Sequence, residues 1–276
     1  MIHFLHKTIF AALYFWFMAT FLFDDIIFGP VSSRRFGVSL GVNLLPVGYK
    51  NCTFNCIYCE CGWTYRNEST HFNLPERKEI SSMLEKKLLE MKSGNQSPDN
   101  ITFAGNGEPT IHPDFAAVID DTIQLRNRYF PLTEITVLSN STMLHKKEVF
   151  GALDKIENNV LKLDTAIEKT YRLLNQPYSK LPLQKVIQNI KKFNGRQIIQ
   201  TLFIRGSFDG QRIDNTTEEE IIAWLDVIKE IAPRYVMVYP IARDTPVKGL
   251  EKISKAELDI ISSHVQALGI MTKTYY

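Results

Sequence analysis

Cysteine is scarce in this sequence and is confined to one short stretch. The 276-residue chain has only four cysteines, and all of them lie between positions 52 and 61. A disulfide framework spreads its cysteines along the chain, so this distribution excludes such a scaffold and favours a metal or redox site.

An excess of charge of either sign is also missing. The 32 Lys and Arg residues face 30 Asp and Glu residues, which leaves a formal net charge of +2. This even balance neither indicates nor excludes a polyanionic partner. With 45% hydrophobic residues, 14 Gly and 12 Pro, the composition is ordinary for a globular protein and excludes a disordered or collagen-like chain.

The longest apolar run, from Ile9 to Phe23, is shorter than the roughly 20 residues that span a bilayer. No small-residue cleavage site of a signal peptide follows it. Arg34 and Arg35 come after the run, so they are not a twin-arginine signal, and insertion would leave the body of the protein in the cytoplasm. Residues 1–23 therefore form a separate hydrophobic segment with three open interpretations: an artefact of start-site choice with Met18 as the true start, membrane contact, or packing onto the core.

Residues 24–276 alternate short β-branched runs with amphipathic helical segments. Two helices carry clear start signals, since Thr217 with Glu220 and Ser254 with Glu257 each have the spacing of a capping box. Alternation of strands and helices implies parallel strands joined by right-handed crossovers. The expected strands are 38–45, 100–104, 134–139, 160–164, 197–205 and 235–240.

Six such units are too few for a complete eight-stranded barrel. The sequence therefore predicts an α/β fold, a partial (βα)6 parallel barrel that occupies residues 24–276 as one domain. In parallel sheets of this kind the chemistry lies at the carboxyl ends of the strands.

Three of the cysteines follow the first of these strands, in the segment NCTFNCIYC. Cys52, Cys56 and Cys59 are close enough in sequence to hold one inorganic centre. Zinc normally takes four ligands, whereas an iron–sulfur cube with three thiolates leaves one iron open for a substrate or cofactor. Cys61 is more simply a bystander than a fourth ligand, and a zinc knuckle or reduced buried thiols remain alternatives at this point.

A second motif, GNGEPT, follows the next strand. Its glycines allow the backbone to approach a ligand closely, and Glu108 presents a carboxylate at the same edge as the cysteines. A cationic amine is the group that such a site would bind, although a loop of this kind alone is more often a turn.

Together these motifs resemble the radical S-adenosylmethionine (radical SAM) superfamily. The C-x3-C-x2-C spacing with Tyr58 before the last cysteine is its cluster motif, and GNGEP is similar to its glycine-rich GGE motif. The stretch FGPVSSRRFGVSLGVNLLP before the cysteines narrows the resemblance to a bacterial branch grouped with wyosine (tRNA imidazoguanosine) synthase-like proteins. The resemblance covers about residues 27–276.

The resemblance implies an enzyme with two cofactors, a [4Fe-4S] cluster and S-adenosylmethionine. Cys52, Cys56 and Cys59 would bind three irons, and S-adenosylmethionine would chelate the fourth. Its reductive cleavage would give methionine and a 5′-deoxyadenosyl radical, which takes hydrogen from an unknown substrate, with a tRNA base as one candidate. The cofactor-binding residues would be Tyr58, Gly105, Asn106, Gly107, Glu108, Pro109, Ser139, Asn140, Asp164 and Ile241.

Softer matches at the later strand ends are Lys162, Gln200, Arg205, Tyr239 and Pro240, each equally consistent with a solvated strand end or a structural ion pair. No residue is assigned a catalytic role on the substrate. The implied partners are S-adenosylmethionine and an external one-electron reductant of the flavodoxin or ferredoxin type. Such a cluster needs a reducing compartment, so a cytoplasmic location is expected.

The sequence departs from the archaeal wyosine synthases in one respect. Those enzymes carry a second cluster on three further cysteines. Cys61 alone cannot supply such a site, which puts pyruvate-condensing chemistry in doubt.

Two other functional classes remain open. A zinc-binding module would explain the cysteines but not GNGEP or the six strand and helix units. An electron-transfer iron–sulfur protein would normally have a suitably placed fourth cysteine. Both alternatives predict no turnover of S-adenosylmethionine.

Overall fold

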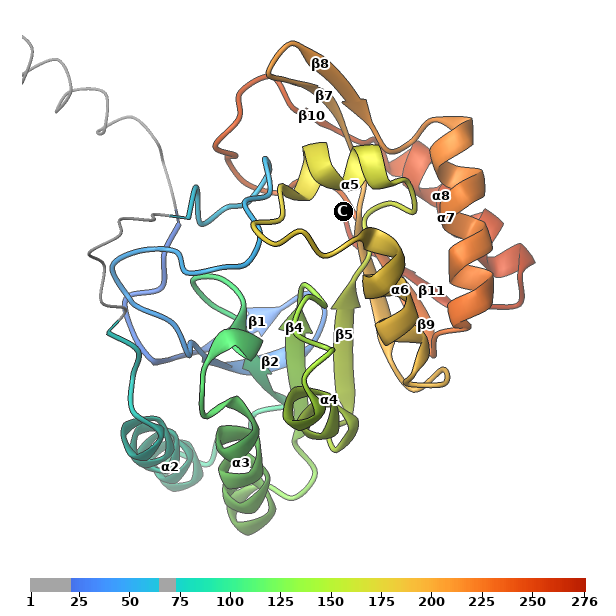
Figure 1. Cartoon of the computed structure of the whole chain (residues 1–276). Coiled ribbons are helices and arrows are strands. Elements are labelled where there is room, and N and C mark those ends of the chain that lie inside the picture. The colour runs from blue at the N-terminus through green and yellow to red at the C-terminus, as the bar shows by residue number, and fades with distance from the viewer. Residues whose placement is uncertain (1–20, 65–72) are drawn as a thin grey trace, which may run out of the picture.

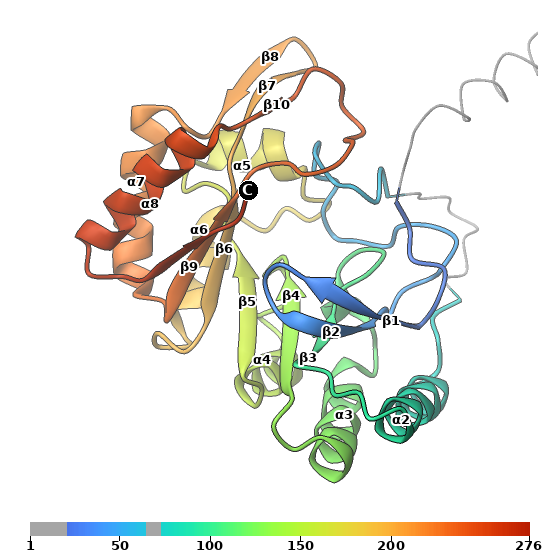
Figure 2. The ribbon, with the colours of Figure 1, turned by 180° about the vertical axis from the view of Figure 1, so that it is seen from behind.

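One large, curved sheet forms the centre of the molecule (Figures 1 and 2). The computed structural model describes residues 21–64 and 73–276, and most of the predicted segment 1–23 lies outside them. Every neighbouring pair of strands in this sheet is parallel except β1 with β2. The strand order is β1 (Ile27–Ser33), β2 (Gly37–Val42), β3 (Asn100–Phe103), β4 (Glu134–Ser139), β5 (Asn158–Lys162), β6 (Ile198–Leu202), β9 (Tyr235–Tyr239) and β11 (Thr272–Thr274).

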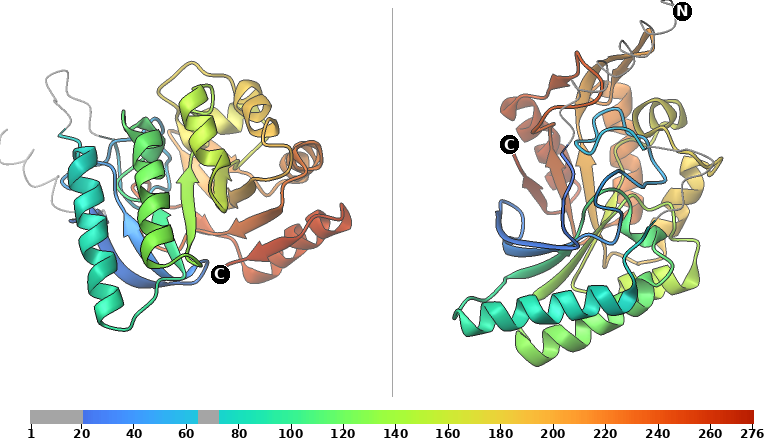
Figure 3. Two further views of the ribbon diagram at one scale, coloured as in Figure 1. Left: turned by 90° about the horizontal axis from the view of Figure 1, so that it is seen from below. Right: turned by 90° about the vertical axis from the view of Figure 1, so that its left-hand side faces the viewer.

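Helices cover the outer face of this sheet, as the view from below shows (Figure 3). Because parallel neighbours need a crossover, a helix follows most of the strands. The prediction of a partial α/β barrel is confirmed. The helices are α2 (Arg77–Ser93), η1 (Pro109–Ile111), α3 (Phe115–Tyr129), α4 (Lys147–Asp154), α5 (Glu168–Asn175), α6 (Leu183–Lys191), α7 (Glu218–Ile231) and α8 (Lys255–Ala267).

All six predicted strands are present, with two differences. The run 197–205 is not one strand, because the chain leaves the barrel after β6 and pairs elsewhere as β7 (Ile204–Phe208). There it forms a small antiparallel sheet with β8 (Gln211–Asp214) and β10 (Glu251–Lys252). In addition, β11 is a seventh parallel strand and β1 an antiparallel edge, neither of which the sequence pattern predicts.

Side chains alternate between the two faces of the parallel strands. Leu161 and Ile199 belong to the main hydrophobic core, which lies between the sheet and the helices. Their neighbours Val160, Ile198 and Met237 form a separate cluster on the opposite, inner face. The inner face therefore has an apolar middle, with polar residues at both ends of the strands: on β5, Asn158 lies at the amino end and Lys162 at the carboxyl end.

The two predicted capping boxes differ in the structure. At α8 both halves are present, because Ser254 accepts from the Glu257 backbone and Glu257 returns the bond to Ser254. At α7 Thr217 accepts from the Glu220 backbone at 3.4 Å, but the Glu220 carboxylate instead accepts from two threonine hydroxyls. That box is therefore only half formed, since tertiary contacts capture the carboxylate.

The described end of the predicted hydrophobic segment contacts β1 and the two motif loops. Phe23 stacks on Phe28 of β1 with ring centroids 3.9 Å apart, and its backbone amide donates to Asn106 at 2.8 Å. The Phe21 amide donates to the Glu60 carbonyl at 2.9 Å. Within the part of the chain that the structure describes, no helix combines the length and apolar character needed to cross a membrane.

Candidate functional site

The cysteine loop and the GNGEP loop meet at the carboxyl edge of the sheet. Asn51 donates its amide to the Asn106 carbonyl at 2.8 Å, and its own carbonyl accepts from the Glu108 amide at 3.2 Å. A β-carbon on Gly107, whose φ is +140°, would lie 1.8 Å from the Asn51 carbonyl oxygen. Glycine at this position therefore admits the backbone of the cysteine loop.

Two other members of the motif serve the same contact. Asn106 is fully buried, and its side chain donates to the carbonyls of Pro46 at 2.8 Å and Phe23 at 2.9 Å. A β-carbon on Gly105 would meet the Asn43 side-chain oxygen at 2.2 Å. The GNGEP loop thus holds the start of the cysteine loop against the end of β3.

Glu108 is buried and accepts hydrogen bonds from four protein donors. Three come from the Thr110 amide, the Thr110 hydroxyl and the Ser139 hydroxyl, and the fourth comes from the Asn140 amide at 2.6 Å. Burial raises the pKa of Glu108, and these hydrogen bonds oppose the rise. The carboxylate joins the GNGEP loop to the end of β4, while Pro109 begins the short helix η1 beside it.

Two of the three motif sulfurs accept hydrogen bonds from the protein. Cys52 Sγ accepts from the Phe54 amide at 3.4 Å and from the Asn140 side chain at 3.5 Å. Cys56 Sγ accepts from the Asn175 side chain, at the end of α5, at 3.5 Å. Donors of this kind are typical of the surroundings of iron–sulfur clusters, whose potentials they tune.

The ionisation of the thiols differs along the loop. Burial raises the pKa of Cys52 to about 12 and also raises that of Cys56. A hydrogen bond from Cys61, together with the charge of Lys50, lowers the pKa of Cys59. Cys61 also donates to the Gly105 carbonyl at 3.6 Å, so the fourth cysteine contacts both loops. Among the described residues, no group of three or more His, Cys, Asp or Glu side chains is arranged to hold a single metal ion.

A buried polar cluster lies directly beside Cys56 on the inner face. Asp164 accepts from the Tyr58 hydroxyl, from Asn175 at 2.8 Å and from the Leu202 amide at 3.1 Å. Lys162 pairs with the same carboxylate at 3.1 Å, and its Nζ lies 4.8 Å from the centre of the Tyr58 ring. The sequence pattern placed Tyr58 and Asp164 near the cofactors, and the structure brings the two into contact.

The other predicted positions separate into two groups. Gln200 and Tyr239 lie on the inner face, where Arg35 contacts both: its guanidinium donates to Gln200 at 3.3 Å and lies 5.4 Å from the Tyr239 ring centre. Arg205 is instead on β7, where it pairs with Glu257 and does not join the cluster. Ile241 is half-buried against the main core, directly after the buried Pro240.

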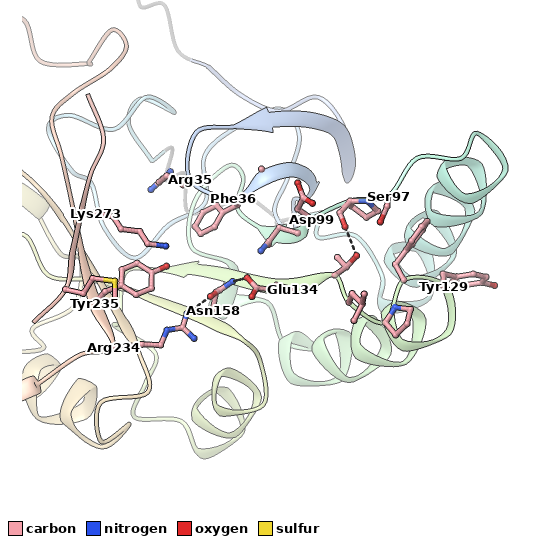
Figure 4. Close-up of a pocket in the computed structure, with 18 residues that line it drawn as sticks. Arg35, Phe36, Ser97, Asp99, Tyr129, Glu134, Asn158, Arg234, Tyr235 and Lys273 are labelled. Carbon is pink, nitrogen blue, oxygen red and sulfur yellow. Dashed lines mark hydrogen bonds between the residues drawn. The ribbon is translucent and has the colours of Figure 1, made fainter.

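A cavity of about 1060 Å³ lies at the opposite, amino-terminal edge of the sheet. In Figure 4, Tyr235 and Lys273 extend into it from one side and Phe36 from the other, with Glu134 at the start of β4. The cysteine loop takes no part in its lining. Size alone would therefore direct attention away from the cysteines, and the chemistry of the residues is the better guide here.

Sequence motifs did not single out two residues that act on the thiols, Asn175 through a hydrogen bond and Lys50 through its charge. Lys50 precedes the first cysteine by two positions, and Asn175 lies 119 positions beyond Cys56. A lysine in a loop gives no signal by itself. Asn175 could be found only from the tertiary structure.

Residues 47–211 match the radical SAM superfamily. The chain is 26% identical over 87% of its length to a protein named GTPase Obg from Brachyspira hyodysenteriae and spans 33% of it. It is 31% identical over 75% of its length to a UPF0026 protein of Methanocaldococcus jannaschii and spans 61% of that protein. The chain therefore spans less than two thirds of each of these relatives.

Solved structures show the same fold at low identity. A radical SAM methyltransferase from Sphaerobacter thermophilus superposes with a TM-score of 0.63 at 15% identity, over 86% of this chain and 66% of that one. Archaeal TYW1 superposes with a TM-score of 0.50 at 12% identity, over 83% and 71%. The family match includes the cysteine loop, the GNGEP loop and the strands β3 to β7, and by this match the chain belongs to the radical SAM superfamily of enzymes.

Proposed function

We propose that the protein is an enzyme that binds a [4Fe-4S] cluster on Cys52, Cys56 and Cys59 and cleaves S-adenosylmethionine reductively. The observation that carries this proposal is the set of three thiols on one loop, two of which accept hydrogen bonds from the protein. When bound, the two cofactors would supply a 5′-deoxyadenosyl radical that takes hydrogen from a substrate. The electron would come from an external carrier of the flavodoxin or ferredoxin type.

The donor chemistry at the carboxyl edge fits this pair of cofactors. Asn140 and Asn175 direct N–H groups at the sulfurs of Cys52 and Cys56, and the charge of Lys50 acts on the same loop, which stabilises thiolate ligands. Tyr58 is oriented by Asp164 beside Cys56, and Ser139 donates to Glu108. We propose that the backbone of residues 105–109, the end of β4 at 139–140, Asp164 and Ile241 surround S-adenosylmethionine, while Glu108 organises this wall through its own bonds.

We propose that the substrate binds at the carboxyl edge of the inner face of the sheet, beside the cysteine loop. Lys162, Gln200, Tyr239 and Arg35 are the polar groups of the described chain that we place there. A tRNA base is one candidate, supported by the resemblance to wyosine synthase-like proteins and by the shared fold with archaeal TYW1. We further propose that residues 24–276 are the catalytic domain, working in the reducing cytoplasm, with residues 1–23 as an accessory segment.

The test is to reconstitute the purified protein with iron and sulfide without oxygen, add dithionite and S-adenosylmethionine, and measure 5′-deoxyadenosine. Product from the wild type and none from Cys56→Ala is expected. Cys61→Ala is the matched control, and we expect it to retain product formation. Zinc in place of iron, or a wild-type protein with a bound cluster that leaves S-adenosylmethionine intact, would overturn the proposal. Addition of unmodified tRNA to the active enzyme then tests the substrate.

A further inference from the structure

Lys50 is a buried lysine with no acidic partner among the described residues. Its side chain and backbone are 2% exposed, and its Nζ donates to the Gly62 carbonyl at 2.9 Å. Two acids of the motif loops are already engaged, since Glu60 pairs with Arg243 at 2.7 Å and Glu108 accepts from four donors. A buried ammonium group without a counter-charge is strongly unfavourable.

Lys50 lies within the cysteine loop. It precedes Cys52 by two positions, and Gly62, whose carbonyl accepts its hydrogen bond, donates its own amide to the Cys59 carbonyl at 2.8 Å. The charge of Lys50 therefore acts on the thiols of Cys59, Cys52 and Cys56. Lys162, a second buried lysine in the same region, has instead a carboxylate partner, Asp164, at 3.1 Å. Asp164 therefore balances the charge of Lys162, whereas in the described chain the groups beside Lys50 are the cysteine thiols.

We infer that Lys50 is a positioning residue whose positive charge balances the iron–sulfur cluster held by Cys52, Cys56 and Cys59 and raises the reduction potential of that cluster. This inference rests on the proposed function. Reduction adds one electron from the external reductant, and therefore one negative charge, to a unit that thiolates already make anionic. A nearby cation stabilises the reduced form more than the oxidised form.

A purely structural role is the alternative that the test must separate. Through Gly62, Lys50 joins the two ends of the cysteine loop, and loss of that bond alone would loosen the loop. A structural role affects whether the cluster is held. It does not predict a graded change in the potential of a cluster that is held, nor a dependence on charge.

The experiment compares the reconstituted full-length wild type with Lys50→Gln, Lys50→Met and Lys50→Arg, and with Lys86→Gln as a matched control on the exposed face of α2. Iron and sulfide are counted per chain, and the cluster is titrated electrochemically with detection by electron paramagnetic resonance. We expect the two neutral variants to have about tenfold less reduced cluster at a fixed solution potential, which is a shift of about 59 mV for one electron. Lys50→Arg and Lys86→Gln should stay close to the wild type.

An unchanged potential in Lys50→Gln and Lys50→Met, with the cluster bound and S-adenosylmethionine cleaved, would overturn this inference and leave the proposed function intact. If the neutral variants fold but hold no iron while Lys50→Arg holds it, the charge is required and the inference stands. If all three Lys50 variants lose iron, the contact with Gly62 is the explanation and the inference fails. A wild-type protein without a cluster would overturn both proposals.

Discussion

The side-chain amide of Asn140 donates a hydrogen bond to the sulfur of Cys52 at 3.5 Å, across 88 positions of the sequence. The same amide donates to the Thr53 hydroxyl at 2.8 Å, and the Asn140 side-chain oxygen accepts from the amide and hydroxyl of Thr142. The end of β4 therefore fixes the position of the first cysteine. Because the backbone amide of Asn140 also donates to Glu108, one residue connects both motif loops.

Replacement of Asn140 by alanine should destabilise the metal-free protein by about 1–3 kcal/mol, since several buried hydrogen bonds are lost together. Urea unfolding measures this free energy. Gln188→Ala, on the exposed side of α6, is the control and should change stability by less than about 0.5 kcal/mol. Equal stability of Asn140→Ala and the wild type would mean that the contact with Cys52 does not organise the loop.

Gly107→Ala should displace the cysteine loop. The added β-carbon would meet the Asn51 carbonyl at 1.8 Å, and the φ of +140° is unfavourable for alanine in any case. We expect a loss of about 2–4 kcal/mol in unfolding free energy and a lower iron content after reconstitution. Gly151→Ala in α4 is the matched control. Nothing lies within 4 Å of its β-carbon, so it should gain up to about 1 kcal/mol. Similar behaviour of the two variants would contradict the steric argument.

Glu108 should make stability depend on pH in a defined direction. Burial raises its pKa in the folded protein above the ordinary value of 4.5, so folding favours the protonated form. The stability that Glu108 contributes is then fully present below pH 4.5 and is lost as the pH rises through the folded-state pKa. Glu108→Gln cannot titrate, so the advantage of the wild type over this variant should shrink with rising pH.

Urea unfolding of both proteins over a pH series measures that difference. Glu148→Gln, on the exposed first turn of α4, is the control and should keep a constant difference from the wild type. A wild-type advantage that grows with pH would show that the four hydrogen bonds outweigh burial and would reverse the sign of the pKa shift.

The strands that the sequence predicted well are those whose apolar residues pack on both faces. The run EITVLS at 134–139 predicts the limits of β4 correctly, and 235–240 predicts β9 to within one residue. Thr272–Thr274 has no apolar pattern, and only pairing with β9 makes it a strand. Pro30 gives β1 the appearance of a turn, which an edge strand tolerates. The continuous run 197–205 could not show where the chain turns out of the barrel at Phe203.

Much of the site was predicted because motif spacing brings Cys52, Cys56 and Glu108 to adjacent strand ends. The role of Glu108 could not be predicted in the same way, since its four donors come from positions up to 32 residues away. The same applies to Lys50, whose importance depends on burial and on the absence of a carboxylate partner in the described chain. Sequence spacing indicates which chemistry is present, whereas packing decides which group performs each part of it.

Asp164 and Lys162 should behave as one unit. Their side chains are 0% and 12% exposed and lie 3.1 Å apart, so Asp164→Asn leaves a buried ammonium group without its partner and should cost about 3–5 kcal/mol. Combining it with Lys162→Met removes both charges, so the double variant should lose clearly less than the sum of the two single variants. Urea unfolding of all four proteins gives the coupling energy.

The surface pair Asp120 and Lys155, whose side chains are 45% and 52% exposed, is the control, and Asp120→Asn should cost at most about 1 kcal/mol. Additive losses at Asp164 and Lys162 would mean that the Tyr58, Asn175 and Leu202 bonds, rather than the ion pair, hold the carboxylate beside Cys56.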